Sequence, residues 1–145
     1  LDINVLLEDI ENELNIIINK NNIHMITRIT QEEIFITGDY NRLKQVFINI
    51  IKNSIESISE YGKIEIIPHI LKDKYYIEIT DNGCGMDEYT LSKAKDLFFT
   101  TKKKGSGLGV SLSNEIIKAH NGSIDYISKP NKGTKVIVKL PITMI

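Results

Sequence analysis

A short stretch of the chain, Asp81-Asn82-Gly83-Cys84-Gly85-Met86, places a carboxylate and two glycines directly after a run of alternating apolar residues. A carboxylate at the end of a strand can accept a charge-assisted hydrogen bond from an exocyclic amine, and glycines beside it allow a flat base to approach the backbone. Asp-Asn-Gly is also a strong turn signal. The stretch is therefore compatible with the floor of an adenine pocket or with an ordinary turn after a strand.

A second candidate group consists of Asn49, Asn53 and Glu56, whose spacings of four and three residues place them on one face of a helix. This face is separate from the apolar face of the same segment. Asparagine is a middling helix former, so two of them one turn apart have a local cost. The face is either a solvated polar surface or a site where one amide oxygen completes the octahedral shell of Mg²⁺, with phosphate oxygens and water supplying the rest.

A third candidate is the glycine-rich stretch Gly105-Ser106-Gly107-Leu108-Gly109-Val110 before a predicted helix, where backbone amides favour an anion. It is not a Walker loop, because no Gly-Lys-Ser/Thr follows, and Val110 replaces the last glycine of a dinucleotide-binding fingerprint. The lysines at 102–104 lie immediately upstream and could reach a triphosphate. The alternatives are a flexible hinge and plain solvated lysines.

The elements that must position these groups are predicted from periodicity. Apolar spacing predicts helices at 5–18, from an N-cap at Asp39 to residue 58, from Asp87 towards residue 95, and at 108–120. Asp2 or Asn4 is available as a cap for the first of them. Alternation and β-branched residues predict β segments at 23–30, 34–37, 63–71, 74–80, 123–128 and 134–140, with Pro68 in an edge strand or at a bulge.

The composition limits the class of protein. A length of 145 residues fits one domain, and a single cysteine, Cys84, excludes an internal disulfide framework, which favours a reducing, cytoplasmic location. The 18 Lys and Arg against 19 Asp and Glu provide no global basic field for nucleic acid, and the apolar runs are too short to span a bilayer. His24, His69 and His120 lack metal-ligand spacing, so each is expected to be structural or on the surface.

Five motifs occur in one order: Asn49-x-x-x-Asn53, Asp81-x-Gly83-x-Gly85, Phe98-Phe99-Thr100-Thr101-Lys102, Gly105-x-Gly107-Leu108-Gly109 and Gly133-Thr134. Together they resemble the Bergerat ATP-binding fold of gyrase, the heat-shock chaperone, MutL and histidine kinases, and the match covers nearly all of the chain. Within that group the chain looks most like the catalytic, ATP-binding domain of a bacterial sensor histidine kinase. The Phe-Phe-Thr-Thr-Lys stretch and residues 53–57 suggest the sporulation-kinase and nitrogen-regulator branch.

This resemblance implies a two-layer α/β sandwich, with helices on one face of a mixed, mostly antiparallel sheet. It also implies that Asp81 binds the adenine amino group, that Asn53 ligates Mg²⁺ and that Asn49 lies by the phosphates. The other implied positions are Gly83 and Gly85 in the base pocket, Thr134 near its water network, and Lys102, Gly105, Gly107, Leu108 and Gly109 at the phosphate end of a lid. Glu56 departs from the lysine that many sensor kinases carry there, which puts a phosphate contact at that position in doubt.

The implied activity is transfer of the γ-phosphoryl group of Mg-ATP to a histidine on another domain, with a response regulator as an indirect partner. Relatives that must activate water or a serine hydroxyl generally look similar in carrying a glutamate, which can act as a base, where this chain has Asn49. A histidine acceptor needs no such base, because its neutral imidazole already has a lone pair. No acidic residue follows any of the three histidines, as it would in a phosphoacceptor box. Residues 1–145 are therefore expected to form one catalytic domain, without the dimerisation and sensor domains, that binds ATP and does not phosphorylate itself. The competing hypotheses are a serine kinase of the anti-sigma type and a nucleotide-sensing scaffold without phosphoryl transfer.

Overall fold

The computed structural model describes residues 1–29, 32–59, 61–93 and 108–143. The elements in chain order are α1 (Ile3–Lys20), β1 (Ile23–Thr27), α2 (Tyr40–Ser57), β2 (Gly62–Leu71), β3 (Lys74–Asp81), α3 (Glu88–Lys93), α4 (Leu108–Ala119), β4 (Ser123–Ser128) and β5 (Thr134–Pro141). Each predicted helix is present, and the described helix ends lie within two residues of the predicted ones. Among the described helices, none has the length and apolar character needed to cross a bilayer.

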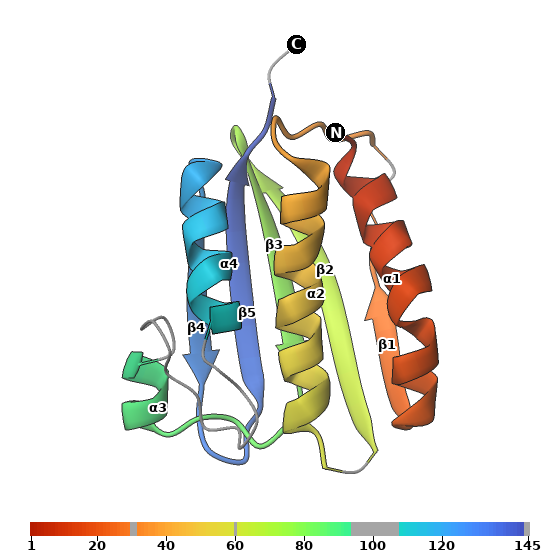
Figure 1. The fold of residues 1–145 in the computed structure, drawn as a ribbon, viewed down its shortest axis with the longest axis vertical. Helices are drawn as coiled ribbons and strands as arrows, with labels where there is room; N and C mark the ends of the chain where they lie inside the picture. The colour runs from red at the N-terminus through yellow and green to blue at the C-terminus, as the bar shows by residue number, and fades with distance from the viewer. Residues whose placement is uncertain (30–31, 60, 94–107, 144–145) are drawn as a thin grey trace.

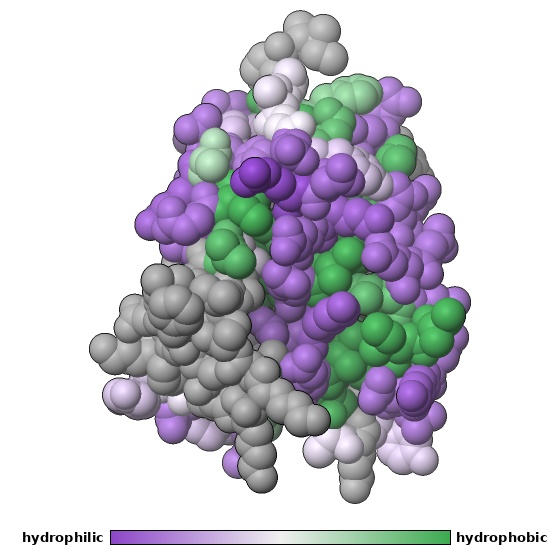
Figure 2. All heavy atoms as spheres, in the orientation of Figure 1, coloured by the Kyte–Doolittle hydropathy of each residue, from purple (hydrophilic) through white to green (hydrophobic). Residues whose placement is uncertain are grey.

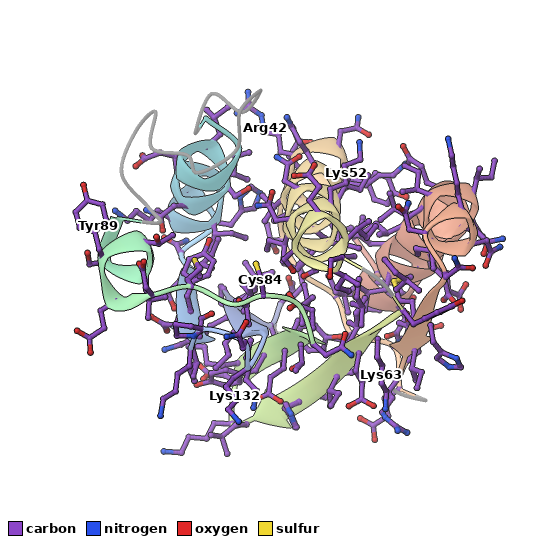
Figure 3. All side chains as sticks on the ribbon, turned by 90° about the horizontal axis from the view of Figure 1, so that it is seen from below. Arg42, Lys52, Lys63, Cys84, Tyr89 and Lys132 are labelled. Carbon is purple, nitrogen blue, oxygen red and sulfur yellow. The ribbon has the colours of Figure 1, made fainter. Side chains whose placement is uncertain are left out.

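The strands form one sheet in the order β1-β2-β3-β5-β4. β1 runs parallel to β2, and the other three pairs are antiparallel. Figure 1 shows α1, α2 and α4 side by side on one face of this sheet, with α3 beyond its β4 edge. The end-on view of Figure 3 separates the helix layer from the sheet, whose other face carries side chains directed to solvent. The predicted two-layer α/β sandwich with a mixed, mostly antiparallel sheet is confirmed.

The core lies between the two layers because alternate strand residues and one stripe of each long helix are apolar. In β3, Tyr75, Ile77 and Ile79 are buried while the residues between them are half-exposed. The outer surface of the helices is mainly hydrophilic, apart from apolar areas over α1 and beside α2 (Figure 2). Ile16 and Ile17 of α1 are among the exposed apolar residues.

The helix starts follow from local capping. Asp2 accepts a hydrogen bond from the Asn4 N–H at 2.9 Å and caps α1, while the Asp39 side chain accepts from the Arg42 N–H at 3.1 Å and caps α2. The prediction of Asp39 as the N-cap is confirmed, and Asp2 rather than Asn4 caps α1. The start of the helix that carries Asn49 and Asn53 is thus set by its own sequence.

Two β-strand predictions are wrong. Residues 34–37 do not form a strand of the sheet, because Phe35 makes only an isolated antiparallel bridge with Asp2. Pro68 lies in β2, which has β1 on one side and β3 on the other, and the register with β3 is unbroken around the proline, so Pro68 is neither in an edge strand nor at a bulge. The proline is tolerated there because β1 pairs with β2 only as far as Ile66.

Candidate nucleotide-binding site

Four residues from four strands form a row across the helix-facing side of the sheet, at the end where β3 finishes. The register pairs Ile64 with Asp81, Asp81 with Thr134, and Thr134 with Ser128. Paired residues point to the same face of a sheet, which here is the face of the buried Ile79. Asp81 and Thr134 are 53 residues apart in sequence, and the sheet makes them neighbours.

Asp81 is a buried carboxylate with 6% of its surface exposed. Its Oδ1 accepts hydrogen bonds from the Gly83 N–H at 2.9 Å and the Thr134 N–H at 3.2 Å. The Ser57 hydroxyl lies 3.4 Å from the same oxygen, but it donates more closely, over 2.8 Å, to the Ser54 carbonyl. Within the described residues, no cationic side chain pairs with Asp81 and no donor reaches Oδ2. Oδ2 is therefore available to accept from the amine of a ligand.

The glycines of this region are required by the close approach of the chain to itself. A Cβ on Gly83 would lie 2.0 Å from the Ser57 Oγ and 2.8 Å from its carbonyl oxygen. Gly85 has φ +70°, and a Cβ there would lie 1.9 Å from the Lys129 carbonyl oxygen. Gly133 has φ +80° and would meet the Asp81 carbonyl oxygen at 2.0 Å. These positions exclude other residues even without a bound base.

The loop after β3 is attached to both layers of the fold. The Cys84 N–H donates to the Ser57 carbonyl at the end of α2 over 2.9 Å, and the Cys84 carbonyl accepts from the Asn131 N–H over 2.7 Å. The Met86 N–H donates to the Ser128 hydroxyl over 2.8 Å. Figure 3 shows Cys84 between the helix layer and the sheet. The loop is thus held at the end of the space between the two layers.

Asn49 and Asn53 lie on the flank of α2 that faces away from α1. Lys44 of α2 forms a 2.7 Å ion pair with Glu13 of α1, so the flank of α2 that carries Lys44 faces α1. Each residue of an α-helix turns the chain by about 100°, and Asn53 follows Lys44 by nine residues. Asn53 therefore lies on the side of α2 opposite Lys44, with Asn49 next to it. α4 packs on that other side of α2 (Figure 1). Both asparagines are half-buried whereas Glu56 is exposed, so the asparagine part of the predicted polar face borders α4 and is not a fully solvated surface.

Part of the predicted phosphate end lies outside the described residues, namely Lys102, Gly105 and Gly107. The backbones of Leu108 and Gly109 form the first turn of α4, which agrees with the prediction that this stretch precedes a helix. The structure therefore brings Asp81, Gly83, Gly85 and Thr134 together at the sheet, and it places Asn49 and Asn53 on the helix above them.

His120 joins the two helices of this region. Its Nε2 accepts from the Asp39 N–H at 3.1 Å, and its Nδ1–H donates to the Ile116 carbonyl at 2.7 Å. The ring packs so closely on Gly38 that a Cβ there would lie 2.3 Å from Cδ2. His120 at the end of α4 thus holds the start of α2, which confirms the expectation of a structural histidine.

Sequence reasoning missed two serines, Ser57 and Ser128, that contact the loop after β3. The Ser57 carbonyl accepts from the Cys84 N–H, and the Ser128 hydroxyl accepts from the Met86 N–H. Serine at the end of a helix or a strand is too common to be a signal. The contact of Ser128 depends on how the strands pair and that of Ser57 on how α2 packs on the sheet, and a local pattern encodes neither.

The comparisons with known proteins agree with this geometry. The model of the family described as "Histidine kinase-, DNA gyrase B-, and HSP90-like ATPase" matches residues 38–144. The chain is 42% identical over 113 residues to Sensor protein DegM of Bacillus sp. (strain B21-2), covering 78% of this chain and 30% of DegM. It is also 42% identical over 125 residues to Sporulation kinase A of Bacillus subtilis (strain 168), covering 85% of this chain and 20% of that kinase. The chain spans less than a third of the length of these relatives.

A solved structure of the catalytic domain of histidine kinase ThkA, in a nucleotide-free form, superposes with a TM-score of 0.87 at 32% identity. The alignment covers 97% of this chain and 93% of that domain. The match therefore extends over a complete catalytic domain. The chain belongs to the family of histidine kinase-, DNA gyrase B- and HSP90-like ATPases, as an ATP-binding catalytic domain of the sensor histidine kinase type.

Proposed function

We propose that this domain binds Mg-ATP and supplies its γ-phosphoryl group to a histidine on a separate dimerisation domain of a two-component sensor kinase. The observation that carries the proposal is the carboxylate of Asp81, which is buried at the end of the sheet without a cationic partner among the described residues. Burying a charge is costly unless something compensates for it. The exocyclic amine of adenine provides that compensation.

The base is proposed to lie on the loop after β3. The Gly83 and Thr134 amides orient the carboxylate of Asp81 by occupying Oδ1, so that Oδ2 accepts from the adenine amino group. Gly83 and Gly85 provide the backbone against which the base lies. Thr134 contributes its hydroxyl to the same floor.

The phosphates are proposed to lie between α2 and the start of α4. Leu108 and Gly109 present the backbone N–H groups of a helix N-terminus, which favour an anion. Lys102, Gly105 and Gly107 are proposed to contact the phosphates from the preceding stretch. Asn49 is proposed to lie beside the γ-phosphate, where it orients and does not act as a base.

The side chains present fit Mg²⁺ that arrives with the nucleotide. No group of three His, Cys, Asp or Glu side chains that could hold a metal occurs in the described parts of the chain. Asn53 offers one hard, neutral oxygen, which suits an ion that keeps several waters and binds phosphate oxygens. When bound, Mg²⁺ neutralises phosphate charge as the transition state develops. Asn53 is proposed to orient that assembly.

Phosphoryl transfer is proposed to break the bond between the γ-phosphorus and its bridging oxygen, so that ADP leaves, and to form a phosphorus–nitrogen bond to the acceptor imidazole. A neutral imidazole already presents a lone pair, so the chemistry needs positioning and charge neutralisation more than a base. Asn49, which cannot take a proton, is consistent with this acceptor. The domain is proposed to work in the cytoplasm as one domain of a longer kinase.

The test is calorimetric titration with ADP, with and without Mg²⁺. Asp81→Asn keeps an oxygen for the Gly83 and Thr134 amides but replaces Oδ2 by an NH₂ donor, so affinity is expected to fall roughly 100-fold. Asn53→Ala is expected to reduce the gain in ADP affinity that Mg²⁺ provides. Asp125→Asn, on the exposed face of β4, is the matched control and should bind as the wild type does. A folded wild-type chain that does not bind ADP would refute the proposal.

The acceptor requires a second experiment. The full-length parent kinase, incubated with ATP labelled at the γ-phosphate, is expected to acquire an acid-labile phosphohistidine outside residues 1–145. Label on a serine of a partner would favour the serine kinase, and ATP binding without any label would favour the scaffold.

A further inference from the structure

The strand-end residue Ser128 makes three contacts that share one hydroxyl group. Its Oγ accepts from the Met86 N–H at 2.8 Å, lies 3.0 Å from the Gly133 carbonyl oxygen and lies 2.8 Å from the Thr134 Oγ1. Ser128 and Thr134 are register partners in β4 and β5. All three contacts are part-buried, and polar groups away from solvent are nearly always hydrogen-bonded.

Only one arrangement of protons satisfies all three contacts. The carbonyl of Gly133 has no proton, so the single proton of Ser128 must be donated to it. The Met86 N–H then occupies one lone pair of Ser128, and the Thr134 hydroxyl must donate to the other. The reverse arrangement would leave the Gly133 and Ser128 oxygens 3.0 Å apart without a hydrogen between them. The Thr134 proton is therefore committed to Ser128.

A Thr134 hydroxyl with a committed proton can only accept on its remaining side. Thr134 is the register partner of Asp81 and donates its N–H to Oδ1. Asp81 is itself an acceptor when ionised. Among the described residues, the side chains of Asp81 and Thr134 at the end of β3 and β5 thus present two acceptors, the carboxylate oxygen Oδ2 and the Thr134 Oγ1.

We propose that Ser128 is a positioning residue that fixes the Thr134 hydroxyl as an acceptor and thereby favours a purine with a 6-amino group over one with a 6-oxo group. The inference rests on the proposed function, because it needs the base to lie against Asp81. A 6-amino group donates two protons and matches two acceptors. Inosine offers these acceptors a single proton, at N1, and its 6-oxo group offers only lone pairs, so one of the two acceptors is left without a donor; a pocket that leaves polar groups unpaired discriminates strongly.

The test compares the dissociation constants of ADP and inosine diphosphate, which differ only at positions 6 and 1 of the base. In Ser128→Ala the Thr134 hydroxyl becomes free to rotate and donate to a 6-oxo group. The preference for ADP is expected to fall about five- to tenfold, mostly because inosine diphosphate binds better. Ser123→Ala, at the other end of β4, is the matched control and should keep the wild-type ratio. Ser128→Thr, which keeps the hydroxyl, is expected to rescue the ratio.

A second background separates positioning from packing. In Thr134→Val there is no hydroxyl to rotate, so adding Ser128→Ala is expected to leave the ratio unchanged. The role of Ser128 is overturned, while ATP binding stands, if Ser128→Ala binds ADP normally and keeps the wild-type ratio of the two dissociation constants. It is also overturned if Ser128→Ala changes that ratio equally in the wild-type and Thr134→Val backgrounds. If the folded wild type binds neither nucleotide, the proposed function fails, and the inference fails with it. Should Ser128→Ala not fold, Ser128→Cys makes the same comparison with a weak acceptor of similar volume.

Discussion

Gly38→Ala tests whether His120 holds the start of α2 against the end of α4. A Cβ at residue 38 would lie 2.3 Å from Cδ2 and 2.6 Å from Nε2 of His120, so the ring must leave its position. The φ angle of Gly38 is not in the positive range, and alanine is therefore compatible with the backbone. The imidazole is the main obstacle to the substitution. Leu43, whose Cδ1 would lie 3.3 Å away, needs to move only slightly.

The expected cost follows from the two hydrogen bonds of the ring. His120 accepts from the Asp39 N–H and donates to the Ile116 carbonyl, and each bond contributes about 1 kcal/mol. Displacing the ring therefore costs about 2 kcal/mol, which the lower entropy of an unfolded chain with alanine offsets by about 0.5 kcal/mol. Gly38→Ala is expected to destabilise the fold by about 1.5 kcal/mol. His120→Ala is expected to cost about 2 kcal/mol.

The decisive result is the sign of the effect in the double variant. Once His120 is alanine there is no ring to displace, so Gly38→Ala should be neutral or stabilising by about 0.5 kcal/mol. The assay is urea unfolding followed by circular dichroism, with the four proteins of the double-mutant cycle. His69→Ala, which removes a half-exposed histidine that pairs with Glu78 at 3.1 Å, is the control background and should leave the cost of Gly38→Ala unchanged. An equal cost in the wild-type and His120→Ala backgrounds would refute the reasoning.

Three further predictions concern the loop after β3, the α3 cap and alkaline stability. Gly85→Ala combines a positive φ with a clash against the Lys129 carbonyl and should destabilise the fold by roughly 2 kcal/mol or more in urea; an unchanged midpoint would contradict this. Asp87 accepts the Thr90 N–H at 2.7 Å, which lowers its pKa. The stabilisation by this cap is therefore complete above the ordinary carboxyl pKa and is lost as pH falls through the lowered pKa. The Thr90 amide should lose protection from hydrogen exchange over that pH range in the wild type but not in Asp87→Ala. The same pH dependence in the variant would exclude Asp87 as the cause. Burial raises the pKa of Tyr126 to about 12. The contribution of its neutral hydroxyl to the stability of the fold is therefore complete below about pH 10 and is lost as pH rises towards 12. Tyr126→Phe should make alkaline unfolding less steep across that range, and an identical slope would count against it.

The elements that were predictable from the sequence are those whose signals are local. α2 has its N-cap at Asp39 and apolar residues at helical spacing, so its start, its length and its polar face were all predictable. The strand before Asp81 was predictable from alternation. The bridge at Phe35 and the position of Pro68 were not, because strand pairing depends on partners distant in sequence.

The same distinction applies to the candidate site. Asp81, Gly83 and Gly85 form a contiguous motif, so they could be singled out from the sequence. Ser128 and His120 could not, because their partners lie 42 and 81 residues away in the chain. A serine or a histidine has no local pattern that announces such a partner. The register of the sheet and the packing of α4 on α2 bring these residues together.

The choice between a base pocket and a plain turn, which the sequence left open at Asp81, depends on burial more than on the glycines. Gly83 and Gly85 are needed in either case, since a Cβ at each would clash with the chain itself. The hydrogen bond from the Gly83 N–H to Asp81 is one that an asparagine or a serine could accept in a turn without burying a charge. Asp87, which only caps a helix, is exposed, whereas Asp81 has 6% of its surface exposed. A buried carboxylate with one oxygen held by backbone amides and the other not reached by any donor in the described chain is a cost that a turn alone does not require. That cost favours the pocket.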